Sequence, residues 1–415
     1  MFEQAPRKRN PLPLIVAVAV GVAAIAGTYL VLRPSSGSDG KGGQGAAASR
    51  TGCVPLVVSA SSEKAALLTE LAGRYASSGR TFGGKKCADV KVYSKASGDS
   101  TTALGRGWDQ ARDGSPAPDV WTPASSSWAR LLQETLAAKD RPALVGGGTQ
   151  PSIAQTPLVI AMPKPMAQAL GWPGKPLGWG DVLGLTTNPK GWAAAGHPEW
   201  GTFKLGKTNP NFSTSGLNAT IGTYYAATGR SSDLSAADVA NPKVTAYVKS
   251  VESGVVHYGD TTLTFLSNLA SAAKDGRGGS YISAVAVEEK SVYDYNTGNP
   301  TGDPKLVGKG RKPQVPLVAI YPKEGTLLSD NPYAVLGTAS AEQRAAAADF
   351  LAFVQAPGQQ KRFTEAAFRD SAGKPGNALS EANGLLPAQK LNILDPPASA
   401  VLAKALTSWD IQRKR

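Results

Sequence analysis

Four short runs rich in serine and threonine each lie where a predicted strand gives way to a predicted helix. The runs are 59–62, 97–102, 122–127 and 211–216. The first N–H groups of a helix lack partners within the helix and carry partial positive charge, so nearby hydroxyls help them to hold an anion or a polar solute. One serine at such a place is usually an N-cap that stabilises only its own helix. Four runs at successive strand ends favour one shared cleft, because open α/β sheets bind ligands at the carboxyl ends of their strands.

The elements that must position these runs alternate between strand and helix. In chain order, apolar runs and helical spacing predict a strand at 54–58, a helix at 63–75, a strand at 90–93, a helix at 101–108, a strand at 118–121, a helix at 127–138 and a strand at 156–162. Beyond residue 163 the same signals predict helices at 216–225, 241–253, 261–273 and 288–295, strands at 280–287 and 315–321, and final helices at 341–355, 359–368 and 398–409. Repeated βα units of this length predict the α/β class, with mostly parallel sheets and helices on both faces.

Two predicted crossings, at 156–162 and 315–321, indicate two lobes built from discontinuous pieces. The sequence predicts lobe 1 at 53–157 and 318–395, lobe 2 at 158–317, and a C-terminal helix with a basic tail at 396–415. Two lobes joined by such crossings enclose a hinge and a cleft that closes on a solute.

Several segments resemble a known family. Pro55–Ser61, Ser97–Ser100, Pro118–Trp121 and Thr208–Gly216 are similar to segments of bacterial extracellular solute-binding proteins of the two-lobed periplasmic-binding type, in particular sulfate and molybdate receptors. The resemblance covers roughly residues 53–395 in order and spacing. It implies a small-molecule solute, no cofactor, and an ABC transporter permease as partner.

The resemblance also implies which side chains bind the ligand. Carried over to this chain, they are Ser61, Ser62, Ser97, Ser100, Ser126, Ser213, Thr214 and Ser215. An oxyanion suits such neutral donors, but Asp99 would repel it unless Lys64, Lys95 or Arg106 offsets its charge. A wall-derived sugar is the other candidate, because aromatic rings stack on sugars; the same rings serve equally well in a core. The aromatic candidates are Trp121, Trp128, Trp192, Trp200 and Tyr281.

The chain also resembles actinobacterial membrane-anchored receptors in which a solute-binding module precedes a von Willebrand factor A domain. The tail at 402–415 is similar to their junction. The metal motif of that second domain does not occur in the sequence, so we expect no metal site. A cell-surface adhesion or scaffold protein with a receptor-like fold is the alternative function, because an uncleaved membrane anchor in place of a lipid tail is unusual for the partner of a transporter.

The N-terminal region predicts a membrane anchor. Residues 12–32 are uncharged, and such a run spans the ~30 Å hydrocarbon core of a bilayer. The basic residues in the tail at 1–11 predict a cytoplasmic N-terminus, and the Gly/Ser-rich segment at 33–52 predicts a flexible linker. We therefore expect a single-pass cell-membrane protein with an extracellular folded domain. A cleaved signal peptide is the alternative, because Ala24–Ala26 resembles a cleavage site.

Charge and cysteine content agree with that location. The formal charge of +13 favours anionic surroundings, such as an acidic wall polymer, and a domain outside the membrane does not meet nucleic acid. The cysteines, Cys53 and Cys87, each precede a predicted strand, so parallel neighbours would bring them within reach of a disulfide. Free thiols or a metal pair are the alternatives, although no histidine lies near them in sequence.

An enzyme would need a catalytic constellation. Ser61–Lys64 and Ser329–Asn331 imitate two motifs of penicillin-binding proteins, in which a lysine activates a serine. The third motif is altered at Lys207–Asn209, the order along the chain differs, and Ser329 is expected in a surface turn. We expect no catalytic residues.

Overall fold

The computed structural model describes residues 50–306 and 309–413. From Gly52 onward the chain forms one compact unit. The predicted cytoplasmic tail, transmembrane segment and nearly all of the linker lie outside the described residues. Within the described part, no helix combines the length and the apolar character needed to cross a membrane.

The first sheet has the strand order β10-β3-β1-β2. Its strands are β1 (Val54–Ala60), β2 (Ala88–Ser94), β3 (Val120–Thr122) and β10 (Ala334–Val335). The first three are parallel, and β10 joins β3 antiparallel. Cys53 and Cys87 directly precede β1 and β2 and form a disulfide, so that prediction is confirmed.

The second sheet has the order β6-β5-β7-β4-β8. Its strands are β4 (Thr156–Pro163), β5 (Leu205–Thr208), β6 (Val255–Gly259), β7 (Ala284–Glu288) and β8 (Leu317–Ile320), and β9 (Leu328–Ser329) pairs with β4. Strand β4 is antiparallel to β7, β8 and β9, whereas β5 is parallel to β6 and β7. The sheets are therefore mixed, and the prediction of mostly parallel sheets was wrong.

The physical reason is the character of β4. All its residues are buried, and a fully buried apolar run shows no alternation from which its direction could be predicted. The element before β4 in the chain is α5, which belongs with the first sheet. No crossover helix precedes it to impose a parallel orientation.

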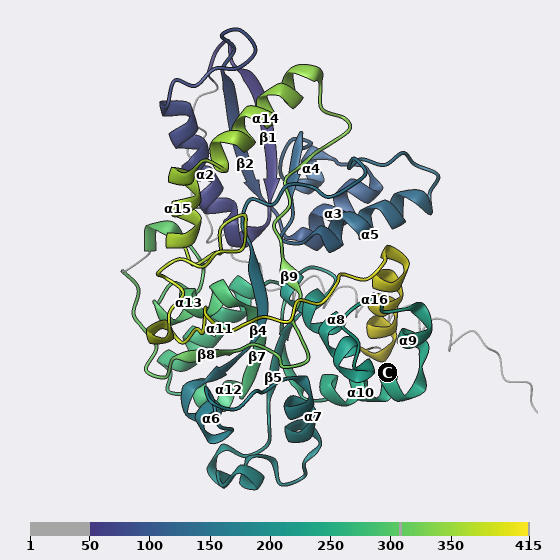
Figure 1. Cartoon of the computed structure of the whole chain (residues 1–415), viewed down its shortest axis with the longest axis vertical. Coiled ribbons are helices and arrows are strands. Elements are labelled where there is room, and N and C mark those ends of the chain that lie inside the picture. Colours follow the sequence, from purple (N-terminus) through teal and green to yellow (C-terminus); the bar gives the residue numbers. More distant parts are fainter. Residues whose placement is uncertain (1–49, 307–308, 414–415) are drawn as a thin grey trace, which may run out of the picture. The chain divides into compact units, whose positions relative to one another are not determined.

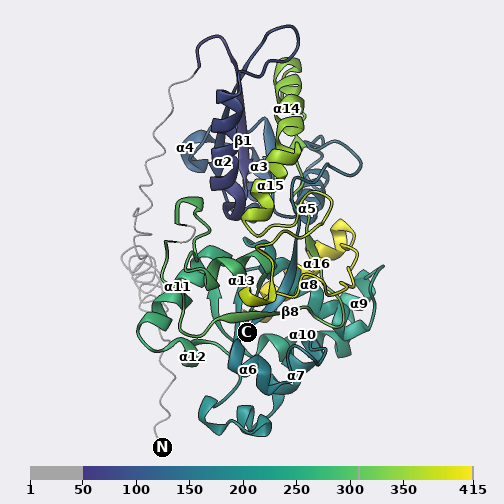
Figure 2. The same cartoon turned by 60° about the vertical axis from the view of Figure 1, so that its left-hand side comes forward.

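Helices cover both sheets (Figures 1 and 2). Those that follow or precede strands of the first sheet are α2 (Ser62–Ser77), α3 (Ser97–Arg106), α4 (Gln110–Asp113), α5 (Ser126–Ala137), α14 (Ala341–Val354) and α15 (Pro357–Glu365). Those that belong with the second are α6 (Lys164–Ala169), α7 (Trp179–Thr187), α8 (Thr214–Thr228), α9 (Ala236–Ala240), α10 (Pro242–Glu252), α11 (Thr262–Lys274), α12 (Gly278–Tyr281) and α13 (Glu289–Asn296). The final helix is α16 (Ser399–Arg413).

The chain crosses between the sheets at two places. It leaves the first sheet at residues 155–156 and returns through residues 329–333, after β8 and β9. Strand β8, expected at the start of the second piece of lobe 1, pairs with β4 in the second sheet. The return to the first sheet therefore lies further along the chain than residue 318.

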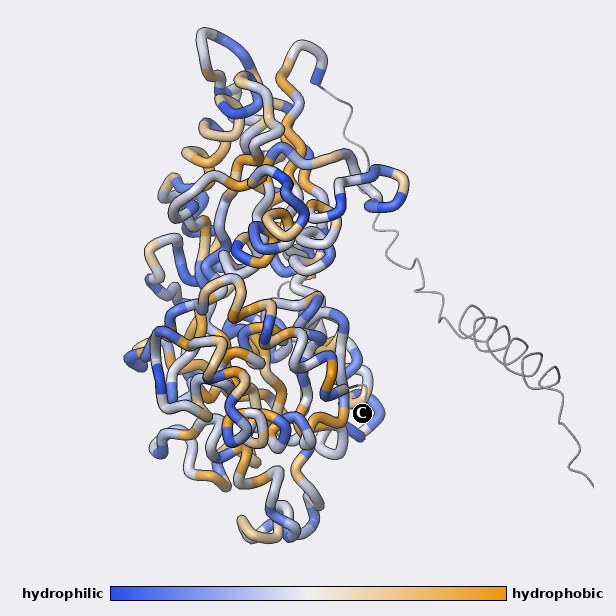
Figure 3. Tube along the Cα trace, turned by 90° about the vertical axis from the view of Figure 1, so that its right-hand side faces the viewer, coloured by the Kyte–Doolittle hydropathy of each residue, from blue (hydrophilic) through white to orange (hydrophobic). Residues whose placement is uncertain are grey.

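Four apolar clusters hold these elements. One joins the first sheet to α2, α14 and α15, and two cover the faces of the second sheet. The fourth packs Trp128 and Leu132 of α5 together with Tyr224 of α8, Val248 of α10 and Leu402 of α16. It therefore joins helices of both sheets, and Figure 3 shows apolar segments concentrated inside the fold.

Candidate functional site

The first serine run surrounds a buried lysine where the two sheets meet. Lys64, in the first turn of α2, has no exposed surface. Its ammonium group donates to Ser61 Oγ (2.8 Å), the Pro123 carbonyl (3.0 Å) and Asn331 Oδ1 (2.9 Å). These acceptors belong to the β1–α2 loop, the β3–α5 loop and the return crossing. One lysine thus bonds three segments that are distant in the sequence. Burial lowers the pKa of its ammonium group to about 7.

The second run packs against the third. Ser97 Oγ accepts a hydrogen bond from the Ala124 amide (3.0 Å). Ser100 Oγ donates to the Ser97 carbonyl (2.9 Å) and accepts from the indole N–H of Trp121 (2.9 Å). Both serines are buried. Their hydroxyls therefore hold the β2–α3 and β3–α5 loops together.

The fourth run, before α8, contains a hydroxyl cluster. Ser215 Oγ lies 2.8 Å from Thr208 Oγ1, 2.9 Å from Thr262 Oγ1 and 3.1 Å from Ser213 Oγ. Thr214 Oγ1 accepts from the indole N–H of Trp128, on α5, at 2.8 Å. This cluster is buried and saturated with internal hydrogen bonds.

The second and fourth runs touch each other directly. The Gly98 amide donates to the Phe212 carbonyl at 3.0 Å. A Cβ atom on Gly98 would lie 2.0 Å from the Asn211 carbonyl oxygen, so only glycine permits this approach. The runs converge from distant parts of the chain, and here they meet without a gap.

Two predicted residues, Ser62 and Ser126, begin helices at this junction. The Ser126 amide donates to Asp330 Oδ1 at 2.7 Å, and its hydroxyl also bonds that carboxyl group. Ser62 is half-buried, and among the described residues its hydroxyl has no hydrogen-bond partner. Of the predicted hydroxyls it is therefore the one most available to a ligand.

Two cavities lie on the other side of the junction, between α2, α13 and α15. The outer cavity has a volume of about 210 Å³, and its walls include Glu63, Leu67, Lys290, Tyr293, Asp294, Arg362 and Phe368. The inner cavity has a volume of about 10 Å³, and its walls include Glu63, Ala124, Glu288, Lys290, Ser329, Asn331 and Phe368. The cavities share Glu63, Lys290 and Phe368, so they lie next to each other, on either side of these residues.

The charged residues at the start of α13 were not predicted as site residues. Glu288, Glu289 and Lys290 are at most 4% exposed. Thr262 Oγ1 donates to Glu288 Oε2 at 3.2 Å. Burial raises the pKa of Glu288 to about 8, and the charge of Glu63 adds to that shift. Charged residues directly after the buried apolar run 284–287 were the available sequence signal.

Two ion pairs fix this segment. Arg369 donates from Nε and Nη2 to the two oxygens of Glu289, at 2.8 and 2.9 Å. The Lys290 ammonium pairs with Asp294 one turn along α13, and burial raises the pKa of Asp294 in spite of that lysine. Removing one partner of such a buried pair would leave an uncompensated charge inside the protein.

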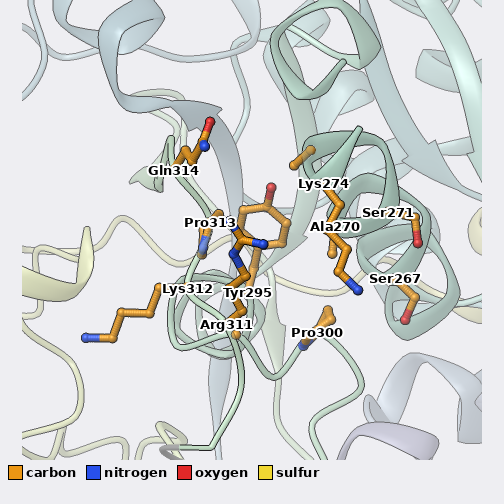
Figure 4. A pocket seen from close by; sticks show the side chains of 12 residues that line it. Ser267, Ala270, Ser271, Lys274, Tyr295, Pro300, Arg311, Lys312, Pro313 and Gln314 are labelled. Atoms are coloured by element: carbon orange, nitrogen blue, oxygen red, sulfur yellow. The ribbon is translucent and has the colours of Figure 1, made fainter. Parts of the chain in front are cut away.

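Other cavities lie on the second sheet's helices. Figure 4 shows one of about 330 Å³ whose walls include Lys274, Tyr295, Arg311 and Lys312. None of the predicted ligand-binding residues lies in its wall.

The aromatic candidates have several roles. Trp121, Trp128 and Trp192 are core residues with at most 2% exposure. Trp200 stacks on His197 with ring centroids 3.8 Å apart and lines another cavity of about 410 Å³. Tyr281 stacks on His257 with centroids 4.0 Å apart. None of these rings lines the outer or the inner cavity.

The enzyme-like motifs come together only in part. Ser61, Lys64 and Asn331 do meet, and Ser329 is fully buried, so its placement in a surface turn was wrong. Ser61 is 2% exposed and lines neither cavity. Lys207 pairs with Glu252 instead. Among the described residues no group of acidic, histidine or cysteine side chains could hold a metal ion.

Comparisons with known proteins agree with this architecture. A family model described as bacterial extracellular solute-binding protein matches residues 56–369. No curated protein matches the chain. Among solved structures, a periplasmic thiamin binding protein is 12% identical, with 87% of this chain and 96% of that chain covered and a TM-score of 0.54.

Two further structures are similar. The periplasmic binding protein AfuA from Actinobacillus pleuropneumoniae, with fructose-6-phosphate bound, is 14% identical, covers 87% of this chain and 99% of its own, and has a TM-score of 0.53. A Trichodesmium protein (IdiA, FutA) in complex with iron and citrate is 11% identical, covers 86% and 99%, and has a TM-score of 0.52. At such identities the likeness shows the fold, which is the two-lobed periplasmic-binding fold.

Proposed function

Because the chain belongs to the bacterial extracellular solute-binding proteins, we propose that it captures a small polar solute in the cleft between its two lobes. The observation that carries the proposal is the pair of neighbouring cavities between α2 and α13 at the junction of the two sheets. The lobes are joined by two crossings, as a hinge requires. The family is one of binding proteins and not of enzymes.

Several of the predicted hydroxyls support this site indirectly. Ser61, Ser97 and Ser100 fix the loops that surround Lys64 and the β3–α5 turn. Ser62 lies beside Glu63 at the start of α2, and its hydroxyl has no partner among the described residues, but it lines neither cavity. Ser213, Thr214 and Ser215 lie on the side of α5 and α8, where the junction is filled with side chains. We propose that they contact a solute only if the lobes separate.

A second candidate function, adhesion or scaffolding with a receptor-like fold, is favoured by a specific observation. The hydroxyls of the fourth run bond one another, and an apolar cluster spans both sheets beside them. A junction filled with side chains is typical of a scaffold. The cavities between α2 and α13 favour the receptor.

We further propose that residues 12–32 anchor the protein in the cell membrane with the folded domain outside, and that an ABC transporter permease receives the solute. Anchoring predicts that the full chain stays in the membrane fraction after washing with high salt. Recovery in the soluble fraction would contradict it.

Native mass spectrometry of the purified full chain in detergent, combined with a thermal-shift panel, tests solute binding. A ligand that binds the native state raises Tm with its concentration. Ala366 lines the outer cavity, so Ala366→Trp should abolish that rise by filling the space. Ala138→Trp, on an exposed position at the end of α5, is the matched control. A rise that persists in Ala366→Trp would place the solute elsewhere.

A further inference from the structure

The cavity of about 330 Å³ in Figure 4 is lined by basic side chains, and we call it the basic cavity. Among the described residues, its wall contains Lys274, Arg311 and Lys312 and no acidic residue. None of these three side chains forms an ion pair or a hydrogen bond with a described residue. Asp275, next to Lys274 in the chain, is paired with Arg277 at 2.9 Å. The positive charges of this wall therefore have no carboxylate partner in the described part of the chain.

The fold brings two of these cations to the cavity from different elements. Lys274 lies in the last turn of α11. Arg311 follows Gly310, whose backbone lies so close to the segment after α13 that a Cβ atom on Gly310 would collide with a carbonyl oxygen there. Figure 4 shows the Arg311 side chain running toward Tyr295, whereas the Lys312 side chain extends away from it. An anion beside Tyr295 would thus meet Lys274 and Arg311 more closely than Lys312.

Tyr295, on α13, supplies a buried hydroxyl to the same cavity. The residue is 4% exposed, and it lines the basic cavity and a neighbouring cavity of about 90 Å³. Its hydroxyl has no hydrogen-bond partner among the described residues and is not fully enclosed by them. Burial raises the pKa of Tyr295 to about 12, so the hydroxyl keeps its proton at neutral pH and can donate it to an acceptor. A buried donor without an acceptor is costly, and a bound ligand that accepts from it would remove that cost.

The rest of the wall is mostly apolar and limits the kind of anion. Ala270, Ala273, Pro300 and Pro313 line the cavity together with the ring of Tyr295. Its volume of about 330 Å³ is at the lower end of the range of small-molecule sites, roughly 300–1,000 Å³. A ligand with one ring or a short aliphatic body would bury its apolar surface against these side chains. An inorganic anion would leave that surface uncovered.

We propose that the basic cavity is a second binding site, which takes a small organic anion with an apolar body. The phosphate or carboxylate group of the ligand accepts hydrogen bonds from Lys274, Arg311 and the Tyr295 hydroxyl. Bonds of this kind between charged groups are strong, and a guanidinium can bind two oxygens of one acidic group. The site shares no wall residue with the cavities between α2 and α13, so it does not depend on the proposed function.

Isothermal titration calorimetry of the full chain in detergent, at constant ionic strength, tests the ligand class. Phenyl phosphate and benzoate are the organic anions. Benzyl alcohol is a neutral compound of similar shape, benzylammonium carries the opposite charge, and sodium phosphate lacks the ring. We expect both organic anions to bind more tightly than the other three compounds. Tighter binding of benzyl alcohol or benzylammonium would refute the anion, and equal affinity for sodium phosphate would refute the apolar body.

Two adjacent positions provide a matched pair of variants, because Arg311→Gln and Lys312→Gln remove the same charge from one segment. Arg311→Gln should weaken phenyl phosphate binding about fivefold or more, and Tyr295→Phe, which keeps the ring, about threefold or more. Lys312→Gln should change it by less than about twofold, because salt screens a charge that makes no contact. Equal weakening by the two charge variants would show a general attraction to basic surface and would refute the site.

Ala366→Trp, which fills the outer cavity between α2 and α13, separates this inference from the proposed function. It should leave phenyl phosphate binding at the wild-type level. If Ala366→Trp abolished that binding and Arg311→Gln did not, the anion would lie in the cleft between the lobes; this result would refute the inference and support the proposed function. If neither organic anion bound, the basic cavity would be refuted as a site, and the proposed function would still stand.

Discussion

Gly98→Ala tests whether the second and fourth serine runs touch in solution. Gly98 lies in the first turn of α3, and its amide donates to the Phe212 carbonyl at 3.0 Å. The added Cβ would lie 2.0 Å from the Asn211 oxygen and 2.7 Å from Phe212 Cα. Both atoms are backbone and cannot rotate away. The two loops must therefore separate by more than ~1 Å to restore ordinary van der Waals distances.

The cost follows from two terms. Overpacking a close contact costs about 1–3 kcal/mol, and the strained hydrogen bond loses about 1 kcal/mol. A total of about 2–4 kcal/mol should lower Tm by roughly 4–8 °C, since each kcal/mol corresponds to about 2 °C in a large domain. If the lobes part instead, small-angle X-ray scattering should show a larger radius of gyration.

Gly73→Ala is the matched control. Gly73 lies within α2, and a Cβ there would meet no atom within 4 Å. Alanine should then stabilise the helix by about 0.5–1 kcal/mol. The reasoning is refuted if Gly98→Ala matches Gly73→Ala in Tm and wild type in scattering.

Three further changes have defined outcomes. Trp409→Ala should lower the free energy of unfolding by about 3–5 kcal/mol, because Trp409 is 4% exposed; an unchanged urea midpoint would show that α16 is not docked. Replacing Cys53 and Cys87 by alanine should cost about 2–4 kcal/mol without changing the circular dichroism spectrum; equal stability would contradict the disulfide. Burial raises the pKa of Glu288 to about 8, so the folded state holds a proton that the unfolded state releases. Between about pH 4.5 and 8 wild type should therefore lose stability relative to Glu288→Gln as pH rises; a constant difference in urea denaturation would count against the shift.

The first βα units were predictable because each signal is local. Val54–Ala60 is an apolar run that ends in small polar residues, and α2 follows with apolar positions at helical spacing. Strands β5 and β6 were missed for the opposite reason. Leu205–Thr208 is four residues long and contains a glycine and a lysine, and most of Val255–Gly259 is partly exposed. Pairing in the sheet, which spacing along the chain does not show, makes these segments strands.

The meeting of the serine runs was predictable, but their hydrogen-bond partners were not, and none of the eight predicted hydroxyl residues lines the two cavities. Sequence order brought the serine runs to one junction because strand ends share one edge of a sheet. A hydroxyl seen in a sequence gives no sign of its partner. The indole N–H of Trp128 donates a hydrogen bond to Thr214 from the other lobe, and that of Trp121 donates to Ser100 from a neighbouring strand. Glu63 and Glu288 are far apart in the sequence, and only folding places the start of α2 and the end of β7 beside the same cavity.

The two sides of the junction have different physical characters, and this difference predicts how it opens. On the side of α5, α8 and α16, an apolar cluster and the bond between Asn211 and Asp410 (2.9 Å) hold the lobes together. Separation there would expose apolar surface at about 25 cal/mol per Å². On the side of α2, α13 and α15, the contacts surround water-accessible cavities. On that side cavities already separate the elements, so opening there breaks fewer apolar contacts. A solute should therefore enter between α2 and α13, while the elements on the apolar side stay together.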